Sequence, residues 1–507
     1  MKKSCAMLLL AFLLAFLAGT ASGEAEITTK EQLNHPGMKI GVSTGSASAE
    51  FAEDEFPEAT IVYLEENTIA YESVAQGKIH AYVFDRDQMQ KAIDSGRKGV
   101  RLLDENMNES VRVAVGISPN ASIPDLQNRL NIFIREIKAD GTLDDMMQRW
   151  VDDGNETMPE IPPAQDPQLH LTVGTSGIVP PYSFYAGQDL SGMDIELAYR
   201  FAAWLGADVR FKVYDYGAII PAAVTGDVDC IMANLNITPE RQEALPFSDV
   251  LYERQIGIMV KGSDSQSSGF IDRIRESFNK TFVREDRWKM FLSGVMTTLL
   301  ITLLSILGGT ALGFAVFLLC RNGNRAANAI THFCTWLIQG MPMVVLLMIL
   351  YYIIFSKSAI SGPAVAIIGF TLTFGATVFG LLKMGVGAVD RGQYEAAYAL
   401  GYSNRRTFFQ IILPQALPHV LPSYKGEIVS LIKATSIVGY IAVQDLTKMG
   451  DIVRSRTYEA FFPLIAITII YFLLEGLLGF LVSRISLNFN PKRRKPETIL
   501  KGVKTDD

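Results

Sequence analysis

The segment NITPERQEALPFSD, residues 236–249, contains an arginine that could bind a small anion. Arg241 stands three residues after Thr238, and a proline between them favours a turn. A guanidinium can donate two parallel hydrogen bonds to a carboxylate, and hydroxyl or amide side chains beside it can add donors. Asn236 and Thr238 are nearby candidate donors, and Asn234 is a further candidate binding residue, in a pocket for a small anion.

This arginine lies in a stretch, residues 168–261, in which short apolar runs alternate with helical patterns. The runs LHLTVGT, DVRFKVYDY and VDCIMANL are typical of strands. Between them, MDIELAYRFAAWLG, capped by Gly206, and IIPAAVTGD are typical of helices. The order predicts an open α/β lobe, whose ligands bind at the carboxyl ends of the strands. Asn234 to Arg241 fall at that edge.

Residues 38–118 repeat this alternation and predict a second α/β lobe. The strand MKIGVST is followed by the small residues Gly45 to Ser48 at the start of a helix. The strand ATIVYLE, a helix and the strand KIHAYVFD follow, and the last strand ends at Asp85. Residues 122–150 predict two further helices, split at Asp140-Gly141.

Long apolar runs dominate residues 291–483, whereas residues 24–290 are polar and mixed. The first part is therefore expected to be soluble and the second to lie in a membrane. Glu427 and Lys433 interrupt the weakest of the apolar segments. The predicted membrane helices are 291–319, 333–355, 362–384, 426–446 and 461–482.

The distribution of Lys and Arg favours an outer binding region and a cytoplasmic C-terminus. The outer loop 445–460 fits this rule less well, because Lys448, Arg454 and Arg456 lie in it among acidic residues. The N-terminal Lys-Lys pair, the apolar run and the small residues after it predict a signal peptide, with a retained anchor as the alternative.

The composition excludes several other classes of protein. The formal net charge of −7 argues against a nucleic-acid partner. The 4 cysteines include no CxxC pair, so neither a metal site nor an internal disulfide framework is expected.

The predicted inner loop, residues 390–424, has the pattern of a helix–glycine–helix hairpin. Residues 393–400 are good helix formers, Gly401 suits a C-terminal cap and Ser403 suits the N-cap of a second helix. Pro414 is expected to stop this second helix.

The sequence EAAYALGYSNRRTFFQIILPQALP in this loop resembles the EAA loop of ABC importer permeases, specifically the polar amino acid uptake subfamily. Three more pieces match in order: GVMTTLLITLLSILGG, QGMPMVVLLMILYY and LIKATSIVGYIAVQDL. The resemblance covers nearly all of 291–485 and implies that the loop docks into a cleft of a separate ATPase subunit. The coupling residues that it implies are Glu395, Ala396, Ala397 and Gly401.

The chain departs from this family at Gln339, where an arginine is usual, and at Ala434, where an acidic residue is usual. Lys433 could extend its amine toward the membrane surface or take part in a transport pathway. The phosphate-binding pattern G-x-x-x-x-G-K-[ST] is absent from the sequence. The chain is therefore expected to bind no cofactor itself and to use ATP and Mg²⁺ through a partner ATPase.

The soluble part resembles the periplasmic solute-binding proteins for polar amino acids. In that family the opening lobe, lobe 1, precedes lobe 2 and the closing helices, whereas here lobe 2 and the closing helices come first. This order predicts a circularly permuted type II bilobed α/β domain; two truncated half-domains are the alternative. The expected parts are a signal peptide (1–23), lobe 2 (24–118), closing helices (119–160), lobe 1 (161–262), a linker (263–290), an all-α permease domain of five helices (291–485) and a cytoplasmic tail (486–507).

The resemblance also implies a ligand site. Arg241 matches the arginine that binds the ligand carboxylate, and Asp85 matches the aspartate that binds its ammonium. Ser46 and Ser48 match carboxylate donors of lobe 2, and Tyr216 matches an aromatic residue that packs on the ligand. A surface ion pair for Arg241 and a core position for Tyr216 are the structural alternatives.

Two departures leave the ligand side chain open. Ser176 stands where glutamine binders often have an acidic residue, and Ser43 stands where some members have lysine. The expected protein is a combined binding and permease subunit of a bacterial ABC importer for glutamine, glutamate or a similar amino acid. It would act in the cytoplasmic membrane with an ATPase dimer and a second permease copy. A ligand-gated receptor or channel, or an enzyme on the same scaffold, is the alternative.

Overall fold

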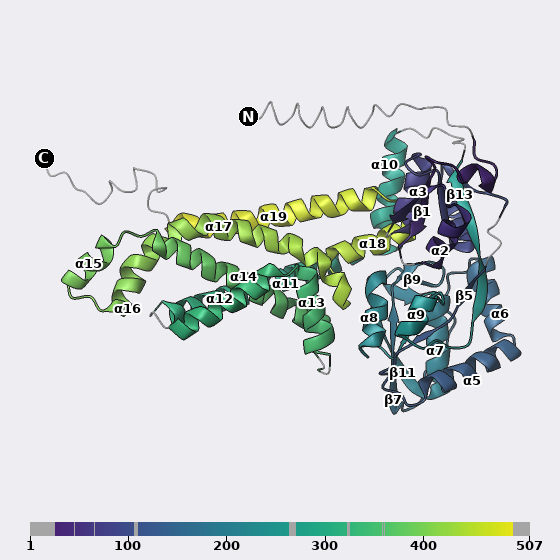
Figure 1. Cartoon of the computed structure of the whole chain (residues 1–507), viewed down its shortest axis with the longest axis horizontal. Helices are drawn as coiled ribbons and strands as arrows, with labels where there is room; N and C mark the ends of the chain where they lie inside the picture. The colour runs from purple at the N-terminus through teal and green to yellow at the C-terminus, as the bar shows by residue number, and fades with distance from the viewer. Residues whose placement is uncertain are drawn as a thin grey trace.

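The structure is a computed structural model, in which two α/β lobes lie at one end of an elongated bundle of helices (Figure 1). The predicted signal peptide, part of the predicted linker and the end of the predicted cytoplasmic tail lie outside the described part of the chain. The described residues are 26–44, 46–64, 66–105, 110–262, 270–321, 325–356, 358 and 360–489.

Lobe 2 is built on a sheet with the strand order β2-β1-β3-β13-β4, with β5 added to β13. β1 pairs in parallel with β2 and β3, so each connection needs a helical crossover. The helices cover the sheet, which explains the continuous apolar runs of its strands. The strands are β1 (Lys39–Ser43), β2 (Thr60–Leu64), β3 (Ala81–Asp85), β4 (Val100–Leu102), β5 (Ser110–Val113) and β13 (Tyr252–Lys261), and the helices are α2 (Ala47–Glu55), α3 (Asn67–Ala75) and α4 (Arg86–Asp94).

Lobe 1 is built on a second sheet with the order β11-β7-β12-β6, beside a small antiparallel sheet β10-β9-β8. Its β7 and β11 are parallel and in full register. The strands are β6 (Gly116–Ile117), β7 (Leu169–Thr175), β8 (Ile178–Val179), β9 (Ser183–Ala186), β10 (Asp189–Ser191), β11 (Ala207–Val213) and β12 (Cys230–Ile231), and the helices are α5 (Leu126–Ala139), α6 (Thr142–Met147), α7 (Met193–Leu205), α8 (Ile219–Val224) and α9 (Pro239–Ala244).

Each sheet contains a strand from the other segment of the chain. β13, at the end of the 161–262 segment, pairs antiparallel with β3 and β4 in lobe 2. β6, at the end of the 24–118 segment, pairs antiparallel with β12 in lobe 1. β5 and β13 also pair with each other where the chain crosses between the lobes. Either segment alone would therefore leave a sheet incomplete.

A buried carboxylate ties the closing helices to lobe 1. Glu196 of α7 is fully buried and accepts hydrogen bonds from Arg149 and Arg200, each at 2.8 Å. The indole Nε1 of Trp150 donates to the same carboxylate at 2.6 Å. A buried charge is tolerated only with such partners, so this cluster fixes α7 against the closing helices.

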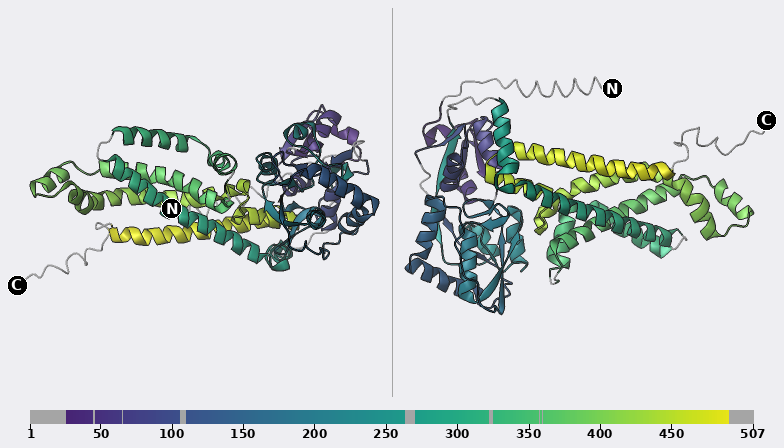
Figure 2. Two further views of the ribbon diagram at one scale, coloured as in Figure 1. Left: turned by 90° about the horizontal axis from the view of Figure 1, so that it is seen from below. Right: turned by 180° about the vertical axis from the view of Figure 1, so that it is seen from behind.

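The helical domain contains, among the described residues, three helices long and apolar enough to cross a membrane, or up to five if each bent pair is one span. Figure 2 shows these helices from two further sides. The three helices are α11 (Trp288–Cys320), α14 (Gly362–Gly387) and α19 (Phe462–Phe489), whose first 23 residues, Phe462–Arg484, meet that test. The bent pairs are α12 (Arg325–Gly340) with the segment Met343–Ile354, which includes α13 (Met343–Met348), and Asn404–Ile441 with α18 (Leu446–Thr457).

Two of the predicted straight spans are corrected by these bends. The predicted span 333–355 bends by 108° between Gly340 and Met343, where Pro342 cannot donate a backbone hydrogen bond. The predicted span 426–446 is the end of the longer helical segment Asn404–Ile441, which meets α18 at 60°.

The expected stop at Pro414 is wrong. The second helix of the hairpin begins with α16 (Asn404–Arg406) and continues through a π-helical turn into α17 (Leu413–Ala434). Pro414 follows directly on the π-helical turn, and Pro418 and Pro422 lie inside α17. Such prolines are tolerated in membrane helices when neighbouring groups satisfy the backbone.

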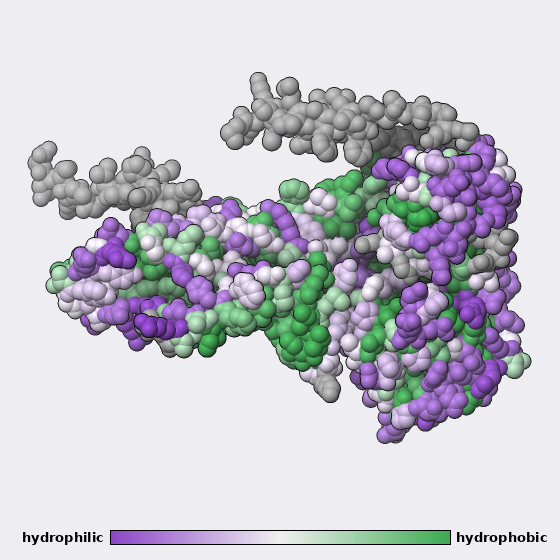
Figure 3. Space-filling view, in the orientation of Figure 1, coloured by the Kyte–Doolittle hydropathy of each residue, from purple (hydrophilic) through white to green (hydrophobic). Residues whose placement is uncertain are grey.

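Small residues let α11 and α14 approach closely. A Cβ on Gly313 of α11 would lie 2.5 Å from the carbonyl oxygen of Gly375 of α14. Because lipid is as apolar as the helices, close packing through glycine is a main source of helix association in membranes. Figure 3 shows the contrast in surface: hydrophilic residues dominate the lobes, and hydrophobic residues gather on the helical domain.

Candidate functional site

A cavity of about 350 Å³ lies between the two lobes and against the helical domain. Its walls come from lobe 2, from lobe 1, from the crossing strands β5 and β13, and from the helical domain. A cavity of a few hundred Å³ at a domain interface, with converging polar groups, suits a small-molecule ligand. Six of the residues predicted from the sequence line it: Ser46, Ser48, Asp85, Tyr216, Asn234 and Asn236.

The wall from lobe 2 consists of helix starts. Ser46 precedes α2, and its Oγ donates to the carbonyl of Ser43 at 2.7 Å and lies 2.8 Å from the Oγ of Ser48. Asp85 ends β3 and caps α4, because its Oδ1 accepts a hydrogen bond from the backbone N of Gln88 at 3.0 Å. The partial positive charge of a helix start favours an anionic group beside it.

Arg254 is a cavity residue that the sequence reasoning missed. It lies on β13, is 5% exposed and forms an ion pair with Asp85. Its Nη2 donates to Asn236 Oδ1 at 3.0 Å, and the guanidinium lies 5.1 Å from the ring centre of Tyr182. Burial lowers the pKa of Arg254 to about 9, so the guanidinium stays charged at neutral pH. A charged residue in the apolar strand YERQIGIMV was the available signal.

The wall from lobe 1 is held by a strained loop. Asn234 has a φ of 54°, in the left-handed region, and its backbone N donates to Asp194 Oδ2 at 2.5 Å. Asp194 is 2% exposed, and burial raises the pKa of its carboxyl to about 7. The hydroxyl of Tyr252 donates to Asn234 Oδ1 at 3.2 Å. These contacts aim the loop at the cavity, with Tyr216 beside it.

Three predicted site residues are not among those that line the cavity: Arg241, Thr238 and Ser176. Thr238 caps α9 and accepts from the backbone N of Arg241 at 3.3 Å. The guanidinium of Arg241 turns back and donates to the carbonyl of Asn236 at 2.8 Å. Arg241 therefore lies behind Asn236, one layer from the cavity. Ser176 is fully buried beside the end of β7.

The helical domain supplies the remaining wall through Tyr440, Lys448, Asp451, Ser455 and Tyr458. The Nζ of Lys448 lies 2.7 Å from Asp215 Oδ1 of lobe 1, which also lines the cavity.

Apolar packing joins lobe 1 to the helical domain as well. One hydrophobic cluster contains Tyr214 and Ile219 of lobe 1 together with Leu346 and Val438 of the helical domain. The cavity is thus part of a packed interface between the two domains.

The predicted glycine hairpin lies at the end of the helical domain remote from the lobes (Figure 1). Its first helix is α15 (Gly392–Ala399), followed by Gly401 at a φ of 81° and by Ser403 as N-cap of α16. Glu395 and Ala396 are exposed, whereas Ala397 is buried.

Phe408 anchors this hairpin to the helical domain. It is buried and stacks on Phe317 with ring centres 5.9 Å apart. Phe409 is 39% exposed, and Leu400 at the elbow is 77% exposed. The elbow therefore presents apolar side chains to the outside of the molecule.

Lys433, whose role the sequence left open, forms an ion pair within the helical domain. Its Nζ lies 3.2 Å from Glu475 Oε2 of α19, and its side chain is 61% exposed. The pair joins α17 to α19.

The comparisons with known proteins identify the helical domain. Residues 311–495 match the family described as binding-protein-dependent transport system inner membrane component. A Rickettsia bellii protein named as a glutamine transport system permease, GlnP, is 34% identical over 194 residues, covering 38% of this chain and 88% of that protein. The chain belongs to this permease family. The arginine transport system permease protein ArtQ of Bacillus subtilis is 31% identical over 195 residues, with coverage of 38% and 88%.

Among solved structures, this permease resembles an amino acid ABC transporter described as crystallised with histidines. That likeness has 26% identity and a TM-score of 0.38, and it covers 44% of this chain and all of the other. As a member of an ABC permease family, the chain is not an enzyme, and ATP hydrolysis belongs to a separate subunit.

Proposed function

We propose that this permease imports a polar amino acid, of the glutamine or glutamate type, and that its two lobes bind the solute before transport. One observation carries the proposal: residues of both lobes and of the helical domain of the same chain line one cavity. Closing two lobes over a ligand is a hinge motion that such an architecture permits.

The chemistry of the cavity supports an amino acid ligand. An α-amino acid needs donors for its carboxylate and an acceptor for its ammonium. The amides of Asn234 and Asn236 offer donors, the hydroxyls of Ser46 and Ser48 offer donors once they rotate away from their present partners, and Asp85 offers the acceptor. Two of the relatives are named for the transport of glutamine and of arginine, both polar amino acids.

Arg254 and Arg241 have different roles in this proposal. Arg254 forms an ion pair with Asp85, and a ligand ammonium group would share Asp85 with it or displace it. Arg241 holds the Asn236 loop from behind, and it reaches a ligand carboxylate only if the loop moves. Thr238 caps α9 behind the same loop rather than contacting the ligand directly, and Ser176 is buried just after β7.

We also propose that the two lobes form one permuted solute-binding domain, because each sheet takes a strand from both segments of the chain. In a membrane the lobes would lie outside and the C-terminus in the cytoplasm. The hairpin, with Glu395, Ala396, Ala397 and Gly401, would then dock on an ATPase that binds ATP and Mg²⁺. Up to five spans are too few for a whole ABC pore, so two permease copies are expected to assemble.

The test is uptake of radiolabelled glutamine into proteoliposomes that contain the full chain and its ATPase partner. We expect uptake that requires ATP, and loss of both uptake and glutamine binding in Asp85→Asn. Asp208→Asn is the matched control, because Asp208 is a half-exposed acid on the far side of lobe 1 and does not line the cavity. The proposal is wrong if glutamine, glutamate, arginine and cystine all fail to bind the wild-type chain.

A further inference from the structure

The segment between β13 and α11 contains an amphipathic helix. This helix, α10 (Phe270–Phe278), is followed by a π-helical turn, Asn279–Val283, that leads toward α11. Ile274 and Phe278 lie four residues apart on one side of α10, and about half of each side chain is exposed. A helix with an apolar side and a charged side, neither of them in a core, is typical of helices that lie on a membrane surface.

The charged side of α10 lies toward lobe 2 and the end of α18. Glu276 Oε1 lies 3.0 Å from the Nζ of Lys280, and the same Nζ lies 3.8 Å from Glu459, just after α18. The pKa of Glu276 is lowered, chiefly by its hydrogen bond to Lys280 and further by the charge of Lys98 in lobe 2. The polar contacts of α10 are therefore made with the protein, and they leave the apolar side free for another environment.

The apolar side of α10 continues into the start of α11 through three aromatic rings. Phe278 packs on Phe282 with ring centres 5.2 Å apart, and Phe282 packs on Phe291 of α11 at 5.0 Å. Val283 and Trp288, beside these rings in the chain, are exposed. The exposed apolar surface therefore extends from α10 to the first residue of α11.

Along α11 the exposed apolar surface becomes a stripe. Its members recur at spacings of three and four residues, which keeps them on one side of a helix. They are Trp288, Leu292, Met296, Leu300, Leu303 and Leu307. Because α11 is long and apolar enough to cross a membrane, this stripe is the side that lipid would cover. Tryptophan is enriched where lipid meets water, so Trp288 marks the level of the bilayer surface.

α10 lies across the end of the helical domain that is next to the lobes. Figures 1 and 2 show it turned across the long axes of α11 and α19. At the same end, Phe461 and Leu464, around the start of α19, are exposed apolar residues. A helix that runs across the membrane-crossing helices lies in the plane of the membrane.

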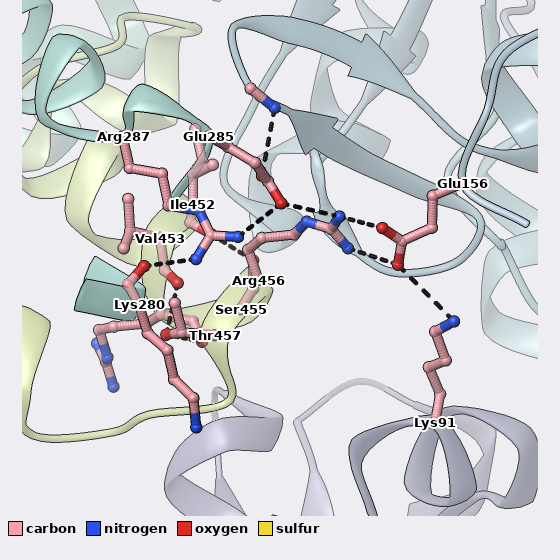
Figure 4. Close-up of polar contacts among 12 residues, drawn as sticks. Lys91, Glu156, Lys280, Glu285, Arg287, Ile452, Val453, Ser455, Arg456 and Thr457 are labelled. Atoms are coloured by element: carbon pink, nitrogen blue, oxygen red, sulfur yellow. Dashed lines mark hydrogen bonds and ion pairs between the residues drawn. The ribbon is translucent and has the colours of Figure 1, made fainter. Parts of the chain in front are cut away.

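Polar contacts fix the turn between α10 and α11 (Figure 4). Arg287 is buried, donates to the carbonyl of Lys280 at 2.6 Å and forms an ion pair with Glu285 at 3.1 Å. Glu285 also lies 3.5 Å from Arg456 of α18, which forms an ion pair with Glu156. These contacts hold α10 in one position relative to α11, so that their apolar sides form one surface.

We propose that the apolar side of α10, together with Val283 and Trp288, is embedded in the membrane–water interface on the side of the lobes, with the lipid bilayer as its partner. Lipid is the occupant because this side continues the lipid-covered stripe of α11. The charged side of the same helix contacts lobe 2, so α10 supports this lobe on the lipid surface. This anchoring goes beyond solute transport and does not depend on which solute the cavity binds.

The first experiment maps α10 against lipid and water with nitroxide labels. Ile274→Cys, Phe278→Cys and Glu276→Cys are made singly in a full chain whose native cysteines are replaced, in nanodiscs of phosphatidylcholine and phosphatidylglycerol. Collisions of each label with oxygen, which concentrates in lipid, are compared with collisions with a water-soluble nickel chelate. Met296→Cys on the α11 stripe is the lipid reference, and Ile132→Cys, exposed on lobe 1, is the water reference.

We expect the labels at Ile274→Cys and Phe278→Cys to favour oxygen severalfold, as the lipid reference does. Glu276→Cys is the matched control, because it lies between them in the chain but on the charged side of α10, and it should resemble the water reference. Measured against lipids that carry quenchers at known depths, the two apolar positions should lie about 5–10 Å below the headgroups. Free access of the nickel chelate to both apolar positions, or a location at the bilayer centre, overturns the proposal.

The second experiment separates lipid from a second copy of this chain as the occupant. The same labels are measured in nanodiscs that hold one copy and in nanodiscs that hold two. A lipid anchor requires access of oxygen to Ile274→Cys and Phe278→Cys in both preparations. Protection from both reagents that appears only with two copies assigns this surface to a contact between subunits and refutes the lipid anchor.

Discussion

The buried carboxyl of Asp194 should make the binding lobes less stable as the pH rises from about 4 to about 7. Burial raises its pKa from 3.8 to about 7, so the folded state keeps a proton that the unfolded state releases in that interval. The proton therefore stabilises the folded state fully below the unfolded-state pKa of 3.8. This stabilisation is lost as the pH rises through the folded-state pKa of about 7. Each pKa unit corresponds to about 1.4 kcal/mol, so the change from 3.8 to about 7 stabilises the folded state by about 4 kcal/mol at low pH relative to high pH.

Asp194→Asn tests this reasoning, because an amide keeps an oxygen for the backbone N of Asn234 but does not titrate. Thermal unfolding of the full chain in detergent, followed from pH 4.5 to pH 8, should show a steep loss of stability in the wild type and a flatter profile in the variant. Asp208→Asn, at a half-exposed position on the same lobe, should leave the wild-type slope unchanged. If Asp194→Asn keeps the full slope, another group titrates and the assignment is wrong.

Three further substitutions probe other parts of the fold. Glu196→Gln should lower the free energy of unfolding of lobe 1 by about 3 kcal/mol, because two arginines and an indole lose a charged acceptor. Urea unfolding measures this loss, and an unchanged midpoint would contradict the prediction. Gly401→Ala should cost about 1 kcal/mol at a φ of 81° and weaken solute-stimulated ATP hydrolysis while glutamine binding persists. Gly313→Val should destabilise the helical domain by about 3 kcal/mol or prevent its assembly in detergent, whereas Gly380→Val, with open space at its Cβ, should be tolerated.

The loop 445–460, which the sequence predicts to lie outside the membrane, shows why one departure from a sequence rule was informative. Basic residues are usually scarce outside the membrane, yet Lys448, Arg454 and Arg456 lie in this loop. In the structure each of them contacts an acidic residue of the binding lobes. Their charges are thus balanced by acidic residues of the same chain, which a count of basic residues in the loops could not predict.

Local patterns were sufficient for most elements around the cavity. LHLTVGT forms β7, and MDIELAYRFAAWL forms α7, which ends at Gly206 with a φ of 71°. The helix split at Asp140-Gly141 and the elbow at Gly401 are also present. Alternation of apolar residues, capping and glycine conformation depend on near neighbours in the chain, so the sequence alone determined them.

The tertiary structure decided which side chains meet. The bend at Pro342 and the helix running through Pro414 depend on how neighbouring helices satisfy the backbone. Arg254 lies beside Asp85 because strand β13, which crosses between the lobes, directs it there. Arg241 lies behind Asn236 because the short helix α9 directs its side chain away from the cavity. The sequence thus determined the lobes, the apolar helices and much of the polar lining. Which residues pair with one another across the cavity, above all those on α18, depends on packing between segments far apart in the chain. The local periodicity of the sequence cannot predict such pairs.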